Sequence, residues 1–386
     1  MRVMRAEPSR FTDVTARSVG AVWRAYDLQL TTYVALLGAI GLVMAYTNSV
    51  EAGESVLTSG TTFTRALMWS GLSMVVFIVA TVFDYRWLKT LSWPIWFVNI
   101  GLLLVTLAIG DGVGGSSRWV SIGPLTFQFS ELAKILMITV LAAYLGNREG
   151  KLDSLGSILG ACVLMGPPWI LVMMQPDLGT SLVLVAILAG MLFMSGASLR
   201  WLVAMGLGAL AAIPVAWTYI LRDYQKDRIL SFLNPAADTQ GSGWQVYQAQ
   251  ITVGSGGFLG TGLTNGAQAR GGFLPVQESD MVFAVLAQEL GFLGALVVFL
   301  LFAALIWRIL SAAWHSKDPF GTLFGAGLAS MLVFQVFVNI GMVIGIMPVT
   351  GIPLPFISNG GASLVTLAVG LGIIQSVNIR QHRAEW

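Results

Sequence analysis

The chain alternates between long apolar runs and short polar segments, and this pattern predicts a membrane protein. A helix needs about 20 mostly apolar residues to cross a bilayer. Ten runs meet this criterion. Two of them, residues 281–308 and 320–346, are longer than a bilayer requires, so we expect these helices to tilt or protrude. The pattern predicts one all-α membrane domain over residues 1–386. The ten runs are residues 28–47, 65–82, 92–110, 130–147, 155–174, 180–196, 200–221, 281–308, 320–346 and 362–379.

One polar stretch, residues 222–280, separates the seventh run from the eighth. It carries four basic and five acidic side chains and is too rich in glycine and polar residues to span a bilayer. Loops longer than about a dozen residues are usually functional or disordered. Because this one also contains aromatic and aliphatic residues, we expect it to fold against the membrane surface and to serve the function.

Composition supports this class, since charged residues make up only 10% of the chain, against about 25% in soluble proteins. A net charge of +2 without a basic cluster gives no indication of a nucleic-acid partner. The single cysteine, Cys162, excludes a disulfide framework and a thiolate metal site. Residues 1–27 lack the apolar core of a signal peptide, so the first run is expected to act as an uncleaved signal anchor.

Lysine and arginine residues predict the orientation, because they are enriched in cytoplasmic loops. Residues 1–27, 83–91, 148–154, 197–200 and 308–319 and the C-terminal end together hold 14 of the 21. Both termini are therefore expected in the cytoplasm and the 222–280 loop outside. All the candidate residues below fall on that outer side. Because nucleotide-activated substrates are absent there, any activated substrate must arrive already energised.

Two basic residues and an acid in this region are candidate site residues. Glu131 and Lys134 lie three residues apart, on one face of a helix. Ionisable residues in a span usually line a cavity or pair with each other, so a structural ion pair is the alternative. The forked guanidinium of Arg118 matches phosphate oxygens, although its neighbour Trp119 is typical of an interfacial anchor.

Two aspartates stand at helix starts. Asp177 lies in a tight turn before the sixth run, where capping of that helix is the alternative explanation. Asp280 lies where the polar loop meets the eighth run, at the level of a lipid head group. A carboxylate is also favoured at a helix N-terminus on electrostatic grounds alone.

Two glycine-rich segments remain. Residues 348–361 are too rich in proline and glycine to be helical, and they end on Ser358, Asn359 and Gly360. Free backbone N–H groups at such a helix start bind anions, and an ordinary capped turn is the alternative. Residues 254–257 lack the Lys-Ser/Thr ending of a phosphate-binding loop, so flexibility or close backbone packing explains them better.

Taken together, the motifs of this chain strongly resemble those of the SEDS family (shape, elongation, division and sporulation). Four residues depart from the usual family pattern: Phe129, Val276, Gln288 and Asn359. The 349–353 segment favours the elongation member over the division member. The matching motifs are Ser117-Arg-Trp-Val, Phe129-Ser-Glu-Leu-Ala-Lys134, Gln175-Pro-Asp-Leu-Gly-Thr180, Gly254-Ser-Gly-Gly-Phe-Leu-Gly-Thr-Gly262, Phe273-Leu-Pro, Ser279-Asp280 and Leu354-Pro-Phe-Ile-Ser-Asn-Gly-Gly361.

The resemblance implies a multi-pass peptidoglycan glycosyltransferase that polymerises lipid II into glycan strands outside the bacterial cytoplasmic (inner) membrane. It implies that Asp280 is the general base and that a class B penicillin-binding protein, a transpeptidase, is the partner. The cofactor stays open between none and a divalent cation such as Mg²⁺ or Mn²⁺. A flippase or transporter of lipid-linked sugars, a division polymerase and a scaffold protein are the alternatives. The expected substrate-binding residues are Arg118, Glu131, Lys134, Asp177, Arg222, Arg228, Ser358 and Gly360.

Overall fold

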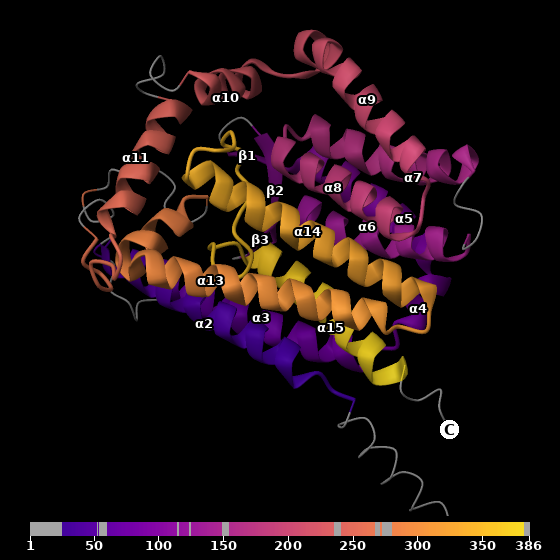
Figure 1. Ribbon diagram of the computed structural model, residues 1–386, viewed down its shortest axis with the longest axis horizontal. Helices are drawn as coiled ribbons and strands as arrows, with labels where there is room; N and C mark the ends of the chain where they lie inside the picture. The colour runs from indigo at the N-terminus through magenta and orange to yellow at the C-terminus, as the bar shows by residue number, and fades with distance from the viewer. Residues whose placement is uncertain are drawn as a thin grey trace, which may run out of the picture.

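The computed structural model is a bundle of long helices (Figure 1). It describes residues 25–51, 53, 60–113, 116–122, 125–148, 154–234, 241–266, 271 and 280–381. Nine helices in this part of the chain are long and apolar enough to cross a membrane, and the shorter α8 makes a tenth. Each of the ten predicted runs is thus a helix, and nine of these helices are candidate spans. The ten helices are α2 (Leu28–Glu51), α3 (Thr62–Val82), α5 (Ser92–Ile109), α6 (Phe129–Gly146), α7 (Leu155–Met174), α8 (Leu178–Met194), α9 (Leu199–Val215, continued by a π-helix over Ala216–Ile220), α13 (Val282–Trp314), α14 (Pro319–Val343) and α15 (Gly361–Gln381).

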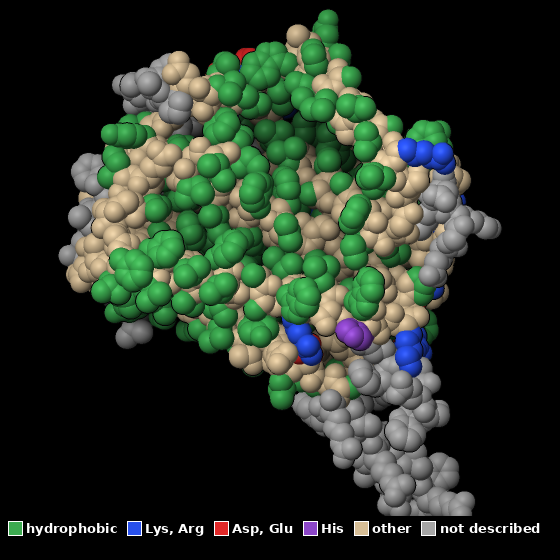
Figure 2. All heavy atoms as spheres, viewed as in Figure 1, with side chains coloured by type: hydrophobic (Ala, Val, Ile, Leu, Met, Phe, Trp, Pro, Cys, Tyr) green, Lys and Arg blue, Asp and Glu red, His purple; other side chains and the backbone are tan. Residues whose placement is uncertain are grey.

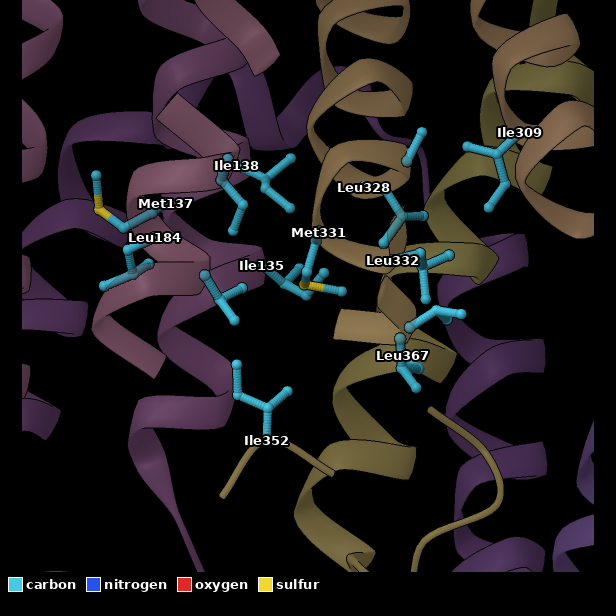
Figure 3. Close-up of a cluster of buried hydrophobic side chains, with 14 of the residues drawn as sticks. Ile135, Met137, Ile138, Leu184, Ile309, Leu328, Met331, Leu332, Ile352 and Leu367 are labelled. Carbon is cyan, nitrogen blue, oxygen red and sulfur yellow. The ribbon is translucent and has the colours of Figure 1, made fainter. Parts of the chain in front are cut away.

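Helices α6, α14 and α15 form the centre of the bundle, because most of the residues in their apolar stretches are buried. Figure 3 shows Ile135 and Ile138 of α6 near Leu328 and Met331 of α14. A small residue lets neighbouring side chains pack against the backbone of α15, since a Cβ on Gly370 would lie 2.9 Å from the side chains of both Ile135 and Leu328. Close packing of this kind drives helix association where lipid is as apolar as the side chains.

Helix α9 is the opposite case, because none of its residues is buried. It runs along the edge of the molecule in Figure 1, and the π-helical turn and α10 (Asp223–Leu233) follow it. In Figure 2 the surface is hollowed between this edge and α14, and hydrophobic side chains line the hollow.

Short elements cover the ends of the bundle. Helix α4 (Arg86–Thr90) links α3 to α5, and α11 (Ser242–Ser255) follows α10 in the long polar stretch. A three-stranded antiparallel sheet, in the order β1-β2-β3, was not predicted. Its strands are β1 (Asp111–Val113), β2 (Ser116–Ile122) and β3 (Leu125–Phe127). The Gly-Gly and Gly-Pro pairs between the strands are the turn signal that could have revealed it.

Helix α13 is broken at Gly291, where φ is 68° and ψ is −170°. A half-helix over residues 282–290 precedes the break, and each residue over 281–289 is buried. The remaining residues, 292–314, measure about 34 Å at 1.5 Å per residue, enough for a bilayer core of about 30 Å. The extra length of the eighth apolar run is therefore used by a separate half-helix inside the protein.

The loop after α11 is bonded to this break. Breaking a helix releases backbone groups that need new partners, and the loop supplies them from both sides. Gly260 and Gly291 touch so closely that a Cβ on Gly291 would lie 2.2 Å from the nitrogen of Gly260. Four backbone bonds join the two segments: Thr261 N to Gln288 O (3.0 Å), Gly262 N to Glu289 O (3.1 Å), Phe292 N to Gly257 O (3.0 Å) and Leu293 N to Phe258 O (3.2 Å).

Candidate active site

One cavity of about 220 Å³ opens at the end of the bundle where α6, α8 and α15 begin. Its wall also includes residues of β2, α10, α14 and the loop between α14 and α15. Six of the nine predicted site residues line it, although they lie up to 229 positions apart in the sequence: Glu131, Lys134, Asp177, Arg228, Asp280 and Gly360.

The first turn of α6 places a buried ion pair in this wall. The Nζ of Lys134 lies 2.7 Å from Oε1 of Glu131, and both side chains are at least 94% buried. The second oxygen of Glu131, Oε2, has no hydrogen-bond partner among the described residues. Lys134 has three N–H donors, so donors remain for a ligand. The pair predicted from the sequence is thus present and faces the cavity.

Asp177 caps α8, as its alternative explanation required. Its Oδ1 accepts a hydrogen bond from the backbone nitrogen of Thr180 at 3.1 Å. Its Oδ2 accepts from Oγ of Ser130 at 3.1 Å and from Nε2 of Gln128 at 3.0 Å. The carboxylate therefore joins the start of α8 to the start of α6, a structural role that holds whatever binds in the cavity.

Asp280 is half-buried and sits just before the buried half-helix. Its backbone oxygen accepts a hydrogen bond from Nδ2 of Asn339 at 3.1 Å, and the same amide donates to the oxygen of Ile352 at 2.8 Å. A Cβ on Gly351, whose φ is 75°, would lie 3.4 Å from Oδ2 of Asp280 and 3.8 Å from Nη1 of Arg228. The carboxylate and the guanidinium therefore flank the same glycine.

Helix α10 holds Arg228 over the cavity. Nη1 of Arg228 donates to the backbone oxygen of Val349 at 3.3 Å, and its guanidinium lies 5.8 Å from the centre of the Tyr224 ring. The hydroxyl of Tyr224 donates to the oxygen of Pro176 at 2.6 Å. These contacts connect α10 to the turn before α8 and to the loop before α15.

The structure does not bring the other predicted residues into the cavity wall. Arg222 is exposed at the start of α10, where its backbone nitrogen donates to Oε1 of Gln225 at 3.0 Å. The hydroxyl of Ser358 accepts from the nitrogen of Leu354 at 2.8 Å, which fits the capped-turn alternative. Gly360 does line the cavity, but its N–H donates to the oxygen of Ser358 at 2.9 Å, so this amide is not open to an anion, contrary to the prediction.

Arg118 lies in β2 next to Trp119, which lines the cavity. The position of the Arg118 side chain lies outside what the structure describes, so its phosphate contact stays a prediction. No group of three His, Cys, Asp or Glu side chains suited to a metal ion occurs within the described ranges.

Two polar residues of α14 were missed. Gln335 lines the cavity, its Oε1 has no partner among the described residues, and Asn339 holds the backbone of Asp280. They lie four residues apart inside an apolar run, hence on one helix face. Polar residues in a span usually mark a functional site, and that signal could have found them.

Comparisons with known proteins identify the family of this chain. The family model for FtsW, RodA and SpoVE, described as cell cycle protein, matches residues 27–383. Peptidoglycan glycosyltransferase MrdB of Escherichia coli K12 is 38% identical over 80% of this chain and 83% of its own. A structure of a peptidoglycan synthase complex covers 93% of this chain and 99% of its own at 31% identity, with a TM-score of 0.79. A structure of rod shape determining protein RodA of Thermus thermophilus covers 93% of this chain and 99% of its own at 29% identity, with a TM-score of 0.69.

Proposed function

The chain belongs to the FtsW, RodA and SpoVE family and is a peptidoglycan glycosyltransferase, and on this premise we propose that Asp280 is its general base. The observation that supports this role most directly is the position of the carboxylate, beside Arg228 at the cavity that Lys134 also lines. A general base must reach the hydroxyl whose proton it takes. Asp280 faces a cavity in which a sugar hydroxyl and a diphosphate would both find partners.

The substrate in this proposal is lipid II. The hydroxyl of an acceptor sugar attacks the anomeric carbon of the donor sugar, and Asp280 accepts the hydroxyl proton. The bond from the anomeric carbon to the diphosphate oxygen breaks, and the polyprenyl diphosphate leaves with the electron pair. Lys134 and Arg228 stabilise the charge that develops on this leaving group, because cations aimed at developing charge lower the barrier.

The lipid tail of the substrate needs a route to the cavity. Arg228, which lines the cavity, belongs to α10, and only the π-helical turn separates α10 from α9 in the chain. The hydrophobic hollow between α9 and α14 in Figure 2 supports entry of a polyprenyl chain from the side of the bundle. We place this reaction on the outer face of the cytoplasmic membrane, as the distribution of lysine and arginine favours.

The relatives support the finer assignments of this proposal. The similar peptidoglycan synthase complex coordinates polymerization and crosslinking. This supports a transpeptidase, a class B penicillin-binding protein, as the partner of this chain. Similarity to MrdB and to rod shape determining protein RodA supports action during cell elongation.

A flippase for lipid-linked sugars is the competing function. A transporter is expected to hold its polar site near the middle of the membrane, between repeats. Here the cavity is lined by the first turns of α6 and α15 and the start of α8, at one end of the bundle. This position favours a polymerase that acts at the membrane surface.

The test of Asp280 is polymerisation of labelled lipid II by the purified Asp280→Asn variant in complex with its transpeptidase partner. The change preserves shape and removes the base, so the rate should fall by about 10²- to 10⁴-fold. Asp223→Asn is the matched control, since that exposed acid lies on α10 outside the cavity. Polymer at the wild-type rate from Asp280→Asn would show that the base lies elsewhere.

A further inference from the structure

The loop bonded to the break in α13 presents two bare apolar side chains. Phe258 and Leu259 are 65% and 75% exposed. The ring of Phe258 stacks on that of Phe292, with centroids 5.9 Å apart and planes at 25°. Phe292 is the first residue of the 292–314 span. Because backbone bonds fix this loop to the break, both apolar side chains are held at one end of a membrane span.

The sequence around this loop is not that of a water-exposed segment. Residues 239–269 contain no aspartate, glutamate, lysine or arginine. A soluble surface of that length would carry about eight charges at the usual frequency of about 25%. The same stretch includes Trp244 and Tyr247, residue types that are enriched where membrane meets water. An uncharged, aromatic segment outside the spans is typical of the bilayer interface.

The apolar surface continues from the loop along the span. Figure 2 shows hydrophobic side chains over α13 and over its junction with α11. Since residues 292–314 are long enough to cross the bilayer core, the loop at their start falls at the boundary between acyl chains and head groups. The exposed residues that follow Phe292 along this span include Leu293, Leu296, Val297, Phe299 and Leu300.

We propose that residues 256–260 form an interfacial anchor, with Phe258 and Leu259 seated among phospholipid chains just below the head groups. The anchor is bonded to the break, and the half-helix on the other side of the break begins beside Asp280. The anchor therefore sets the depth at which Asp280 stands relative to the lipid surface. This inference concerns membrane contact, and it holds or fails independently of the chemical role of Asp280.

The experiment measures whether a fluorescent label at the tip of the anchor, position 258 or 259, is surrounded by lipid or by water. The full chain with Cys162→Ser carries a single cysteine, Phe258→Cys, labelled with an environment-sensitive dye. It is reconstituted in vesicles of phosphatidylethanolamine and phosphatidylglycerol that contain phosphatidylcholine spin-labelled near the head group. Leu259→Cys repeats the measurement in case the first variant fails to fold. Asp223→Cys is the aqueous control, because that side chain is 98% exposed on α10.

The anchor predicts that spin-labelled lipid quenches the tip label more strongly than aqueous iodide does, with the reverse order at position 223. A spin label at the end of the acyl chain should quench the tip less than the shallow one. Stronger quenching by iodide at both tip positions would overturn the proposal. A label shielded from both quenchers would also overturn it. Shielding that disappears on dilution with lipid would assign the surface to a second copy of the chain, and shielding that requires the transpeptidase would assign it to the partner.

Discussion

The buried pair of Glu131 and Lys134 has a structural role and a proposed catalytic role, and mutation can distinguish the two. Both side chains lie in the protein interior with 2.7 Å between Nζ and Oε1. Removing one partner of a buried pair leaves an uncompensated charge and typically costs about 3 to 5 kcal/mol. Lys134→Met should therefore unfold at a clearly lower temperature. Its loss of activity alone would not show what the lysine does.

A double variant, Glu131→Met with Lys134→Met, removes both charges and keeps side chains of similar volume. Replacing a whole buried pair by well-packed hydrophobic residues of similar volume is often neutral in stability or stabilising by about 1 to 4 kcal/mol, so the fold should recover. If Lys134 stabilises the leaving diphosphate, the rate should stay low. Losing one such contact costs about 10²- to 10³-fold, equivalent to about 2.7 to 4 kcal/mol at 1.36 kcal/mol per tenfold.

The assay pairs thermal unfolding with polymer formed from labelled lipid II at equal amounts of folded protein. Lys226→Met is the control, because Lys226 pairs on α10 with Asp223, whose side chain is 98% exposed, and such surface pairs contribute little to stability. It should change neither quantity. A double variant that polymerises at the wild-type rate would refute the role of Lys134 at the leaving group and leave the pair a purely structural one.

Three further changes test the fold and the orientation. Gly291→Ala should destabilise the folded protein by about 2 to 5 kcal/mol, because of the positive φ and the contact with neighbouring backbone. Gly254→Ala, with open space around it, should not, and equal melting temperatures of the two variants would contradict the break. Asn339→Leu should leave the general base ionisable but displaced, so the maximal polymerisation rate should fall more than the substrate KM changes, and an unchanged rate would remove Asn339 from positioning. Ser242→Cys and Ser316→Cys, each made in a chain without Cys162, should differ in labelling by an impermeant reagent. Position 242 should be labelled in intact cells and position 316 should not, and the opposite result would reverse the orientation.

The helices were predictable because hydropathy reports the requirement that each span must meet. Long apolar runs in a chain with so few charges leave little choice, and all ten spans lie where the runs are. Lys134 and Asp280 were found for the same reason, since a charge in or beside an apolar run is conspicuous. The structure brings these two together in one cavity, which the sequence implied only through a family resemblance.

The break in α13 could not be read from hydropathy. The apolar run contains Gln288 and Glu289 but continues past Gly291, and an isolated glycine inside such a run does not reveal its backbone angles. The partners of the broken segment lie about 30 residues away, in the 257–262 loop. This pairing is tertiary, so no local pattern encodes it. The small sheet was missed for another reason: two of its three strands, β1 and β3, are only three residues long and carry too little periodicity to predict.

The exposure of α9 has a consequence for how this protein changes over evolutionary time. A side chain packed in the core must match its neighbours in shape as well as polarity, but α9 buries none of its residues. Its sequence is therefore constrained by composition and length, and it should drift among apolar residues faster than α6 or α14. A foreign apolar helix of equal length spliced in place of α9 should fold in this chain more readily than the same chain carrying one added methyl group at Gly291.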